Sequence, residues 1–317
     1  MPAATLTSQI PKVSTARFTT DLDLTSDELA ALFLLAARVK RSPRQFAHKL
    51  SGRYLALLFE KPSLRTRMTF ELAMKQLGGD AVFTDCNGGR IGDREPIQDV
   101  ARNLERWVSG IVARTYQQAT IDELSRWAAV PVINALSDLY HPCQVLADFF
   151  TLQEKFGQLR GLKLAFVGDG NNVAHSLMLT GSRLGVDIAI ATPSGYEPNR
   201  EIFAMAAGFA AAAGCSLRLT NDAFEAVEGA HAVYTDVWAS MGQEKESGRR
   251  RKDFAGYQVT GKLMAAALPE AAFMHCLPAH RGEEVVDEVM ESAASIVFEQ
   301  AENRLHAQKA LLLMMLS

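Results

Sequence analysis

The chain has 317 residues, with 33 lysines and arginines against 36 aspartates and glutamates, so its formal net charge is −3. Hydrophobic residues make up 48% and charged residues 22%, which is typical of a packed globular protein and excludes a disordered or fibrous one. At about 150 residues per domain, the length predicts two domains.

The apolar and basic runs exclude two further classes of protein. The longest apolar runs, residues 29–37 and 310–316, are far shorter than the roughly 18 residues that a membrane-spanning helix needs. The one basic run, residues 249–252, is short, and we expect it to be a solvated loop rather than part of a nucleic-acid-binding stripe. The sequence therefore predicts no membrane and no nucleic-acid partner.

The cysteines and the N-terminus indicate the compartment. The four cysteines are far apart and form no Cys-x-x-Cys pair, so we expect no zinc site, no disulfide framework and no cofactor. Reduced cysteines are typical of the cytoplasm, which we predict here. The first 20 residues hold only Lys12 and Arg17 as basic residues, and Pro11 interrupts any helix, so we expect an unstructured leader of about 15 residues.

The first half of the chain reads as alternating helices and strands. A helix is predicted from Thr25, whose capping box with Glu28 satisfies two backbone donors, to about Lys40. Apolar residues 54–59 predict a strand, and a helical pattern covers residues 64–77.

The same alternation continues toward the middle of the chain. Short strands are predicted at residues 111–114 and 132–135, with a helix at 121–128 between them. A long helix is predicted from Pro142 to about Phe156, because proline is favoured at the first helical position.

The second half predicts a second sheet. Strand-like segments occur at residues 164–167, 187–191, 216–219, 232–237 and 272–276, with helical patterns between most of them. This alternation predicts an α/β protein of two domains, each a mostly parallel sheet flanked by helices, the two joined by long helices. The glycine-bounded turn at 157–161 sets the expected boundary, so that residues 1–156 form one domain and residues 157–300 the other.

Polar residues that follow the strands are candidates for chemistry, because ligands bind at the carboxyl ends of strands in open parallel sheets. Ser63, Arg65 and Thr66 open the helix after the strand at 54–59. The unpaired N–H groups of a helix N-terminus, two hydroxyls and a guanidinium suit a phosphate. The alternative is a capped helix with surface arginines. A P-loop motif is absent from the sequence.

The next candidates follow other predicted strands. His141 at a helix start could donate to a carbonyl oxygen, and Gln144 could accept from an amide, although a lone histidine there is more often structural. Arg114 ends its strand and is equally ambiguous. The segment Gly168-Asp169-Gly170 lacks the third glycine of a dinucleotide fingerprint, so we expect no NAD, whereas Asn172 could bind a carboxylate.

Two candidates lie near the ends of the last strands. Asp236 could pair with an ammonium group and Ser240 could assist, in a segment that could close over a ligand or be a mobile surface loop. Cys276 could act as a nucleophile, contact a bound amine, or be an inert buried thiol.

Taken together and in order, these motifs resemble the ornithine carbamoyltransferase family. The matching segments are residues 59–67 (FEKPSLRTR), 141–144 (HPCQ), 236–244 with its SMG core, 275–278 (HCLP) and 299–304 (EQAENR). The first two are shared with aspartate carbamoyltransferases, whereas the SMG and HCLP segments resemble the ornithine branch. The resemblance extends from about Phe18 to the C-terminus.

The resemblance implies a role for each matching residue. Carbamoyl phosphate would be bound by Ser63, Leu64, Arg65, Thr66, Arg90, Arg114, His141, Pro142, Cys143, Gln144, Cys276, Leu277 and Arg304. L-Ornithine would be bound by Asn172, Asp236, Ser240 and Met241, and the catalytic residues would be Arg65, Arg114, His141 and Cys276. Two positions depart from the family: Leu64 stands where many relatives have threonine, and Arg90, which would reach a neighbouring subunit's phosphate, stands where relatives often have glutamine.

The resemblance also implies an activity and an assembly. The δ-amine of ornithine would attack carbamoyl phosphate and give citrulline and phosphate, the chemistry of arginine biosynthesis and of the urea cycle. The protein would be a homotrimer or a multiple of one, with the C-terminal helix (residues 301–317) packed back on the first, carbamoyl-phosphate-binding domain. Alternatives are transfer to N-acylornithine or putrescine, and a catalytically silent ligand-binding protein on the same fold.

Overall fold

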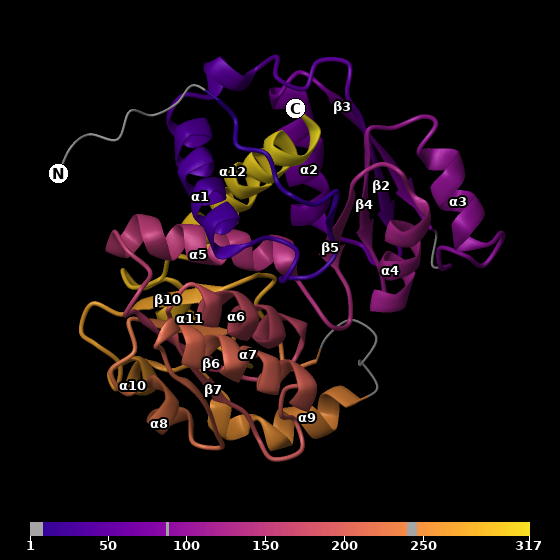
Figure 1. Ribbon diagram of the computed structural model, residues 1–317. Coiled ribbons are helices and arrows are strands. Elements are labelled where there is room, and N and C mark those ends of the chain that lie inside the picture. Colours follow the sequence, from indigo (N-terminus) through magenta and orange to yellow (C-terminus); the bar gives the residue numbers. More distant parts are fainter. Residues whose placement is uncertain (1–8, 87–88, 240–245) are drawn as a thin grey trace.

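The computed structural model describes residues 9–86, 89–239 and 246–317 (Figure 1). Two five-stranded sheets lie in separate lobes, with strand orders β1-β5-β4-β2-β3 and β10-β9-β6-β7-β8. The strand pairs in both sheets are parallel. Helices flank both sheets (Figure 1), so the two-sheet α/β fold predicted from the sequence is confirmed.

The first sheet and its helices come from the first half of the chain. The strands are β1 (Arg17–Phe18), β2 (Tyr54–Phe59), β3 (Asp80–Asp85), β4 (Gly110–Arg114) and β5 (Val132–Leu136). The helices are α1 (Ser26–Arg41), the 3-10 helix η1 (Pro43–Phe46), α2 (Leu64–Gln76), α3 (Ile97–Leu104), α4 (Gln118–Trp127) and α5 (Pro142–Phe156).

The second sheet and the last helix follow. The strands are β6 (Lys163–Val167), β7 (Asp187–Ala191), β8 (Leu217–Thr220), β9 (Ala232–Thr235) and β10 (Ala272–His275). The helices are α6 (Asn172–Arg183), α7 (Arg200–Ala213), α8 (Ala223–Val227), α9 (Ser247–Asp253), the 3-10 helix η3 (Ala255–Tyr257), α10 (Gly261–Met264), α11 (Asp287–Met290) and α12 (Val297–Leu316).

Local sequence signals set the ends of helices α1 and α5. The Thr25 hydroxyl accepts from the Glu28 N–H over 3.1 Å, and the Glu28 carboxylate accepts from the Thr25 N–H over 2.7 Å. The predicted capping box at the start of α1 is thus confirmed. Helix α5 begins at Pro142, as predicted, and ends at Phe156; the next residue, Gly157, has a φ of 80°, which suits the left-handed C-terminal cap.

The last helix connects the two lobes. Helix α12 starts beside β10 of the second sheet and packs against α1, α2 and α5 of the first lobe (Figure 1). Leu311, Leu312 and Leu313 are completely buried there. The C-terminal end of the chain therefore forms part of the core of the N-terminal lobe.

Two expectations about charged or terminal segments differ from the structure. The basic run at 249–252 is not a solvated loop: it lies in α9, and Arg250 is buried with its Nη1 2.7 Å from Oδ2 of Asp169. Part of the expected leader is also packed against the rest of the protein. Ile10 and Val13 pack against the core, and the Ser14 N–H donates to Glu28, so the predicted leader of about 15 residues is too long.

The strand predicted at 232–237 ends earlier in the structure, at Thr235. Asp236 therefore lies in the loop that follows β9 and not in the strand itself.

Across the described residues, none of the helices combines the length and the apolar character that a membrane-spanning segment requires.

Candidate active site

A cavity of about 350 Å³ lies between the carboxyl ends of strands from both sheets. Its walls come from the β2–α2 loop, the ends of β4, β5, β9 and β10, the starts of α5 and α6, and α12. The predicted site residues that line it are Ser63, Leu64, Arg65, Thr66, Arg114, His141, Gln144, Asn172, Asp236, Cys276, Leu277 and Arg304. The structure thus brings together residues that are up to 241 positions apart in the sequence, from Ser63 to Arg304.

The N-terminus of α2 forms one wall. The Ser63 side chain caps the helix by accepting from the Thr66 N–H over 3.2 Å. The Thr66 hydroxyl in turn accepts from Nη2 of Arg304 over 3.1 Å. Arg65 follows the cap, and its pKa is lowered by partial burial, which Cys276 and Asp236 oppose. The partial positive charge of the helix end and the guanidinium groups together favour an anion.

Two buried arginines add to this positive charge. Arg114 is 6% exposed, and burial together with the charges of Arg304 and Arg65 lowers its pKa to about 9, so it remains a cation at neutral pH. Within the described residues, Nε of Arg114 and Nε of Arg304 are buried without a hydrogen-bond partner. Buried donors that lack partners are costly, so these two guanidinium groups are not fully neutralised by hydrogen bonds within the described residues.

His141 caps the start of α5 and stays neutral. Burial, followed by the charges of Arg304 and Arg114, lowers the pKa of its imidazole well below 6.5. Its backbone N–H donates to Oγ of Ser176 over 2.9 Å, and that hydroxyl donates to Oδ2 of Asp21 over 2.5 Å. This chain of bonds fixes the histidine backbone, and the neutral ring can donate a single hydrogen bond to a carbonyl oxygen.

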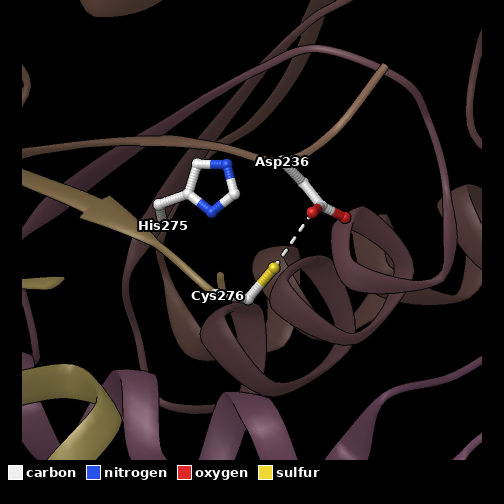
Figure 2. A group of neighbouring side chains, drawn as sticks. All are labelled: Asp236, His275 and Cys276. Carbon is white, nitrogen blue, oxygen red and sulfur yellow. Dashed lines mark hydrogen bonds between the residues drawn. The ribbon is translucent and has the colours of Figure 1, made fainter. Parts of the chain in front are cut away.

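The part of the lining that follows β9 and β10 carries a carboxylate and a thiol, Asp236 and Cys276, whose side chains are drawn in Figure 2. Oδ1 of Asp236 accepts from the Cys276 thiol over 3.0 Å and from the Val237 N–H over 2.8 Å, while Oδ2 accepts from Nδ2 of Asn171 over 2.9 Å. Burial, and then the neighbouring Asp236, raise the pKa of Cys276 well above 9. Because the sulfur keeps its proton, the structure favours a polar contact over a covalent nucleophile.

The three residues drawn in Figure 2 also form a candidate metal cluster. Asp236, His275 and Cys276 offer ligand atoms within 4.8 Å of one another. Both ring nitrogens of His275 already have partners, however: Nε2 lies 3.1 Å from Glu284 and Nδ1 accepts from the Leu277 N–H over 2.8 Å. We therefore assign no metal to this cluster: His275 binds Glu284 and the backbone after β10, and Cys276 binds Asp236.

Several predicted site residues lie elsewhere. Arg90 does not line the cavity, and its guanidinium lies over the ring of Tyr116. Pro142 and Cys143 are buried outside the lining, and the Cys143 thiol donates to the carbonyl oxygen of Asn134 over 3.3 Å. Ser240 and Met241 lie outside the described residues.

Asn172 lines the cavity as expected, but its amide is already engaged. Its Nδ2 donates to the Ser137 carbonyl over 2.7 Å. Sequence reasoning missed Lys61 and His280, which also line the cavity. Lys61 stands inside the quoted motif at 59–67 and could have been found there, whereas no local pattern marks His280.

The cavity therefore has two electrostatic halves, which come from different parts of the fold. Three guanidinium groups and a helix N-terminus, from the N-terminal lobe and α12, suit an anionic group rich in oxygen, and the Asp236 carboxylate, from the second lobe, suits an ammonium group. A neutral imidazole lies at the same cavity and can polarise a carbonyl. This arrangement suits a reaction between a phosphorylated small molecule and an amine.

The comparisons agree over nearly the whole chain. The family model for the carbamoyl-P binding domain of aspartate/ornithine carbamoyltransferases matches residues 17–154, and that for the Asp/Orn binding domain matches residues 160–315. An ornithine carbamoyltransferase of Thermus thermophilus is 53% identical over 91% of this chain and 93% of its own. An anabolic ornithine carbamoyltransferase of Pyrococcus furiosus is 50% identical over 90% of this chain and 89% of its own.

A solved structure gives the same result for the fold. Ornithine carbamoyltransferase from Pyrococcus furiosus superposes with a TM-score of 0.91 and 48% identity, covering 95% of this chain and 96% of that one. Both halves of the chain and its three-dimensional arrangement thus match one group of enzymes. The chain belongs to the aspartate/ornithine carbamoyltransferase family.

Proposed function

We propose that the protein transfers the carbamoyl group of carbamoyl phosphate to the δ-amine of L-ornithine, giving L-citrulline and phosphate. The observation that carries this proposal is the cavity, in which cationic residues face the Asp236 carboxylate and the Cys276 thiol. Relatives of about 50% identity that are named ornithine carbamoyltransferase support the choice of acceptor.

Carbamoyl phosphate would occupy the cationic half. Ser63, Thr66 and the backbone of Leu64 would hold its phosphate together with Arg65 and Arg304. Arg114 and His141 would polarise the carbamoyl carbonyl, and Gln144 would accept from the carbamoyl nitrogen. Removing one such donor to a developing oxyanion costs about 3–4 kcal/mol in other enzymes. The leaving phosphate can take up the proton of the amine, so the reaction needs no protein base.

Ornithine would occupy the half that carries the carboxylate. Asp236 would pair with its α-ammonium group, and Asn172, Ser240 and Met241 would complete the contacts to its α-amine and α-carboxylate. Only the neutral δ-amine is a nucleophile, and its unperturbed pKa should resemble that of lysine, about 10.4. Loss of water from the cavity would lower that pKa.

The two lobes would divide the substrates between them. Residues 1–156, with α12 packed on them, would bind carbamoyl phosphate, and residues 157–300 would bind ornithine. The two family models support this division because they meet between residues 154 and 160. The relative named anabolic supports a role in arginine biosynthesis, and the four free cysteines support a cytoplasmic location.

A homotrimer would cover an exposed apolar face. Leu64, Met68 and Leu72 recur at four-residue spacing on α2 and are 74%, 45% and 37% exposed. Val82 lies on the neighbouring edge strand β3 and is 59% exposed. An apolar helix face beside an unpaired strand edge is suited to association with a second copy. Arg90 would then approach the neighbouring copy's phosphate site.

The acceptor is tested by citrulline formation. Carbamoyl phosphate is incubated with L-ornithine, N-acetylornithine, putrescine or aspartate, and ureido product is measured by colour. We expect product with ornithine alone, because an acylated α-nitrogen has no charge for Asp236 and putrescine has no carboxylate. Asp236→Asn should raise the KM for ornithine far more than that for carbamoyl phosphate. Absence of product with all four amines would contradict the proposal.

A further inference from the structure

A buried carboxylate with no role in the scheme above lies next to the cavity. Asp148 is one helical turn after Gln144 on α5 and is completely buried. Its Oδ1 accepts from Nε2 of Gln144 over 2.8 Å and from Nε2 of Gln300 over 2.7 Å, and its Oδ2 accepts from the Tyr234 hydroxyl over 3.2 Å. It does not line the cavity, so it can act on a substrate only through its neighbours.

Asp148 and Arg304 together fix the orientation of the Gln144 amide. The Gln144 NH₂ group donates to Asp148, and its carbonyl oxygen Oε1 accepts from Nη1 of Arg304 over 2.5 Å. A flipped amide would place its NH₂ against a guanidinium and its oxygen against a carboxylate. Both hydrogen bonds would be lost, and two repulsive contacts would replace them.

Gln144 lines the cavity, and the fixed orientation of its amide leaves one lone pair of the carbonyl oxygen for a ligand. A carbonyl oxygen has two lone pairs, and within the described residues only Arg304 donates to Oε1. A carbamoyl group presents an NH₂ donor, whereas an acetyl group presents a methyl of similar size at the same position. A site that hydrogen-bonds a substrate N–H rejects the analogue that lacks it.

We propose that Asp148 is a positioning residue that holds the Gln144 carbonyl oxygen toward the substrate and thereby sets the preference for carbamoyl phosphate over acetyl phosphate. This inference rests on the proposed function. The proposed role depends on Oδ1 as a hydrogen-bond acceptor and not on the charge of the carboxylate. Burial raises the pKa of Asp148 to about 7, and a proton on Oδ2 would leave Oδ1 free to accept both amides.

Three variants separate this role from a general role in packing. Asp148→Asn keeps an oxygen that can accept from Gln144 and Gln300. Asp148→Leu keeps the volume and removes the acceptor. Tyr234→Phe is the matched control, because it removes a hydrogen bond from the same buried carboxylate but leaves the bond to Gln144. Each variant is assayed as full-length protein for the KM of carbamoyl phosphate and for inhibition by acetyl phosphate and by inorganic phosphate.

The measured quantity is the ratio of the acetyl phosphate Ki to the carbamoyl phosphate KM. We expect Asp148→Leu to lower this ratio by roughly tenfold, since one hydrogen bond is lost. The KM should rise, while both inhibition constants stay within about threefold, because neither inhibitor offers an N–H to Gln144. Asp148→Asn and Tyr234→Phe should keep the wild-type ratio.

Several results would overturn the inference. An equal rise of the KM and both inhibition constants in Asp148→Leu would assign Asp148 a role in packing only. If Asp148→Asn folds but its ratio is lowered, an accepting oxygen at this position is not sufficient, and the proposed role of Oδ1 is contradicted. If Asp148→Leu does not fold, Gln144→Met must lower the ratio by the same factor, and a wild-type ratio there would refute the proposal. A wild-type protein that makes no citrulline would instead count against the proposed function.

Discussion

The thiol of Cys276 donates a hydrogen bond to Oδ1 of Asp236 over 3.0 Å (Figure 2), and both residues line the cavity. Burial and this carboxylate raise the pKa of the thiol well above 9. At neutral pH the sulfur therefore keeps the proton with which it hydrogen-bonds Asp236. A hydroxyl can donate the same bond, whereas a methyl cannot.

This relationship predicts that Cys276→Ser keeps kcat within about tenfold of wild type, whereas Cys276→Ala loses more. The rate of citrulline formation measures this effect.

The same relationship predicts that iodoacetamide alkylates Cys276 more slowly than free glutathione at pH 7.5, since only a thiolate reacts. Mass spectrometry of the alkylated protein measures this rate. Alkylation at the rate of glutathione, or a faster one, would show that the thiol is ionised and would contradict the assignment.

Arg65 should be the residue of the β2–α2 loop on which phosphate binding depends most. Its side chain has no hydrogen bond or ion pair with other described residues, so it is available for a ligand in the cavity. We expect Arg65→Ala to lower kcat/KM for carbamoyl phosphate by roughly 10²–10³-fold. Arg106→Ala, at a largely exposed side chain, should stay within twofold. Wild-type turnover in Arg65→Ala would refute the phosphate site.

Asp21 should make stability depend on pH. Burial raises its pKa from 3.8 to about 6, although Ser176 and Thr180 hydrogen-bond its carboxylate. Between about pH 4 and 6 the folded state therefore holds a proton that the unfolded state has lost. The contribution of Asp21 to the free energy of unfolding therefore falls as pH rises through this range, and Asp21→Asn should lack this contribution.

The measurement is urea unfolding of both proteins at pH 4.5, 5.5 and 6.5. Other titrating groups are common to the two proteins, so the difference between their free energies of unfolding reports Asp21 alone. That difference should move in favour of the variant as pH rises. Parallel pH profiles would show that the folded state does not shift the pKa of Asp21.

The buried ion pair between Arg250 and Asp169 should contribute strongly to stability. Its guanidinium also donates to the Trp238 carbonyl over 2.8 Å. Arg250→Ala would leave Asp169 buried without its cation, which costs about 3–5 kcal/mol. The neighbouring Arg249 is a matched control, because its side chain is 80% exposed and its removal should cost less than about 1 kcal/mol. Equal losses in denaturant unfolding would contradict this prediction.

The sequence predicted best those elements whose signals are local. The strand at 54–59 and the helix that starts at Pro142 have the predicted bounds, because an apolar run and an N-terminal proline are visible in a few neighbouring residues. Strand β3 was missed: its residues, Asp80–Asp85, are all partly or fully exposed at the sheet edge, so no apolar run marks it.

Interactions between distant segments could not be predicted in the same way. The buried state of Arg250 depends on Asp169, which lies 81 positions earlier in the chain, so the basic run alone indicated a solvated loop. The motifs indicated which residues to expect at the cavity, but not that the Gln144 amide is held between Arg304 and Asp148. Such partners become neighbours only when α5 and α12 pack.

Helix α12 has a consequence for synthesis of the protein on the ribosome. It fills the core of the N-terminal lobe and brings Arg304 to the cavity. The N-terminal lobe is thus translated first but cannot bury its apolar surface until the end of α12 has emerged. A stop codon anywhere before Arg304 should therefore give inactive protein that is prone to aggregation or degradation.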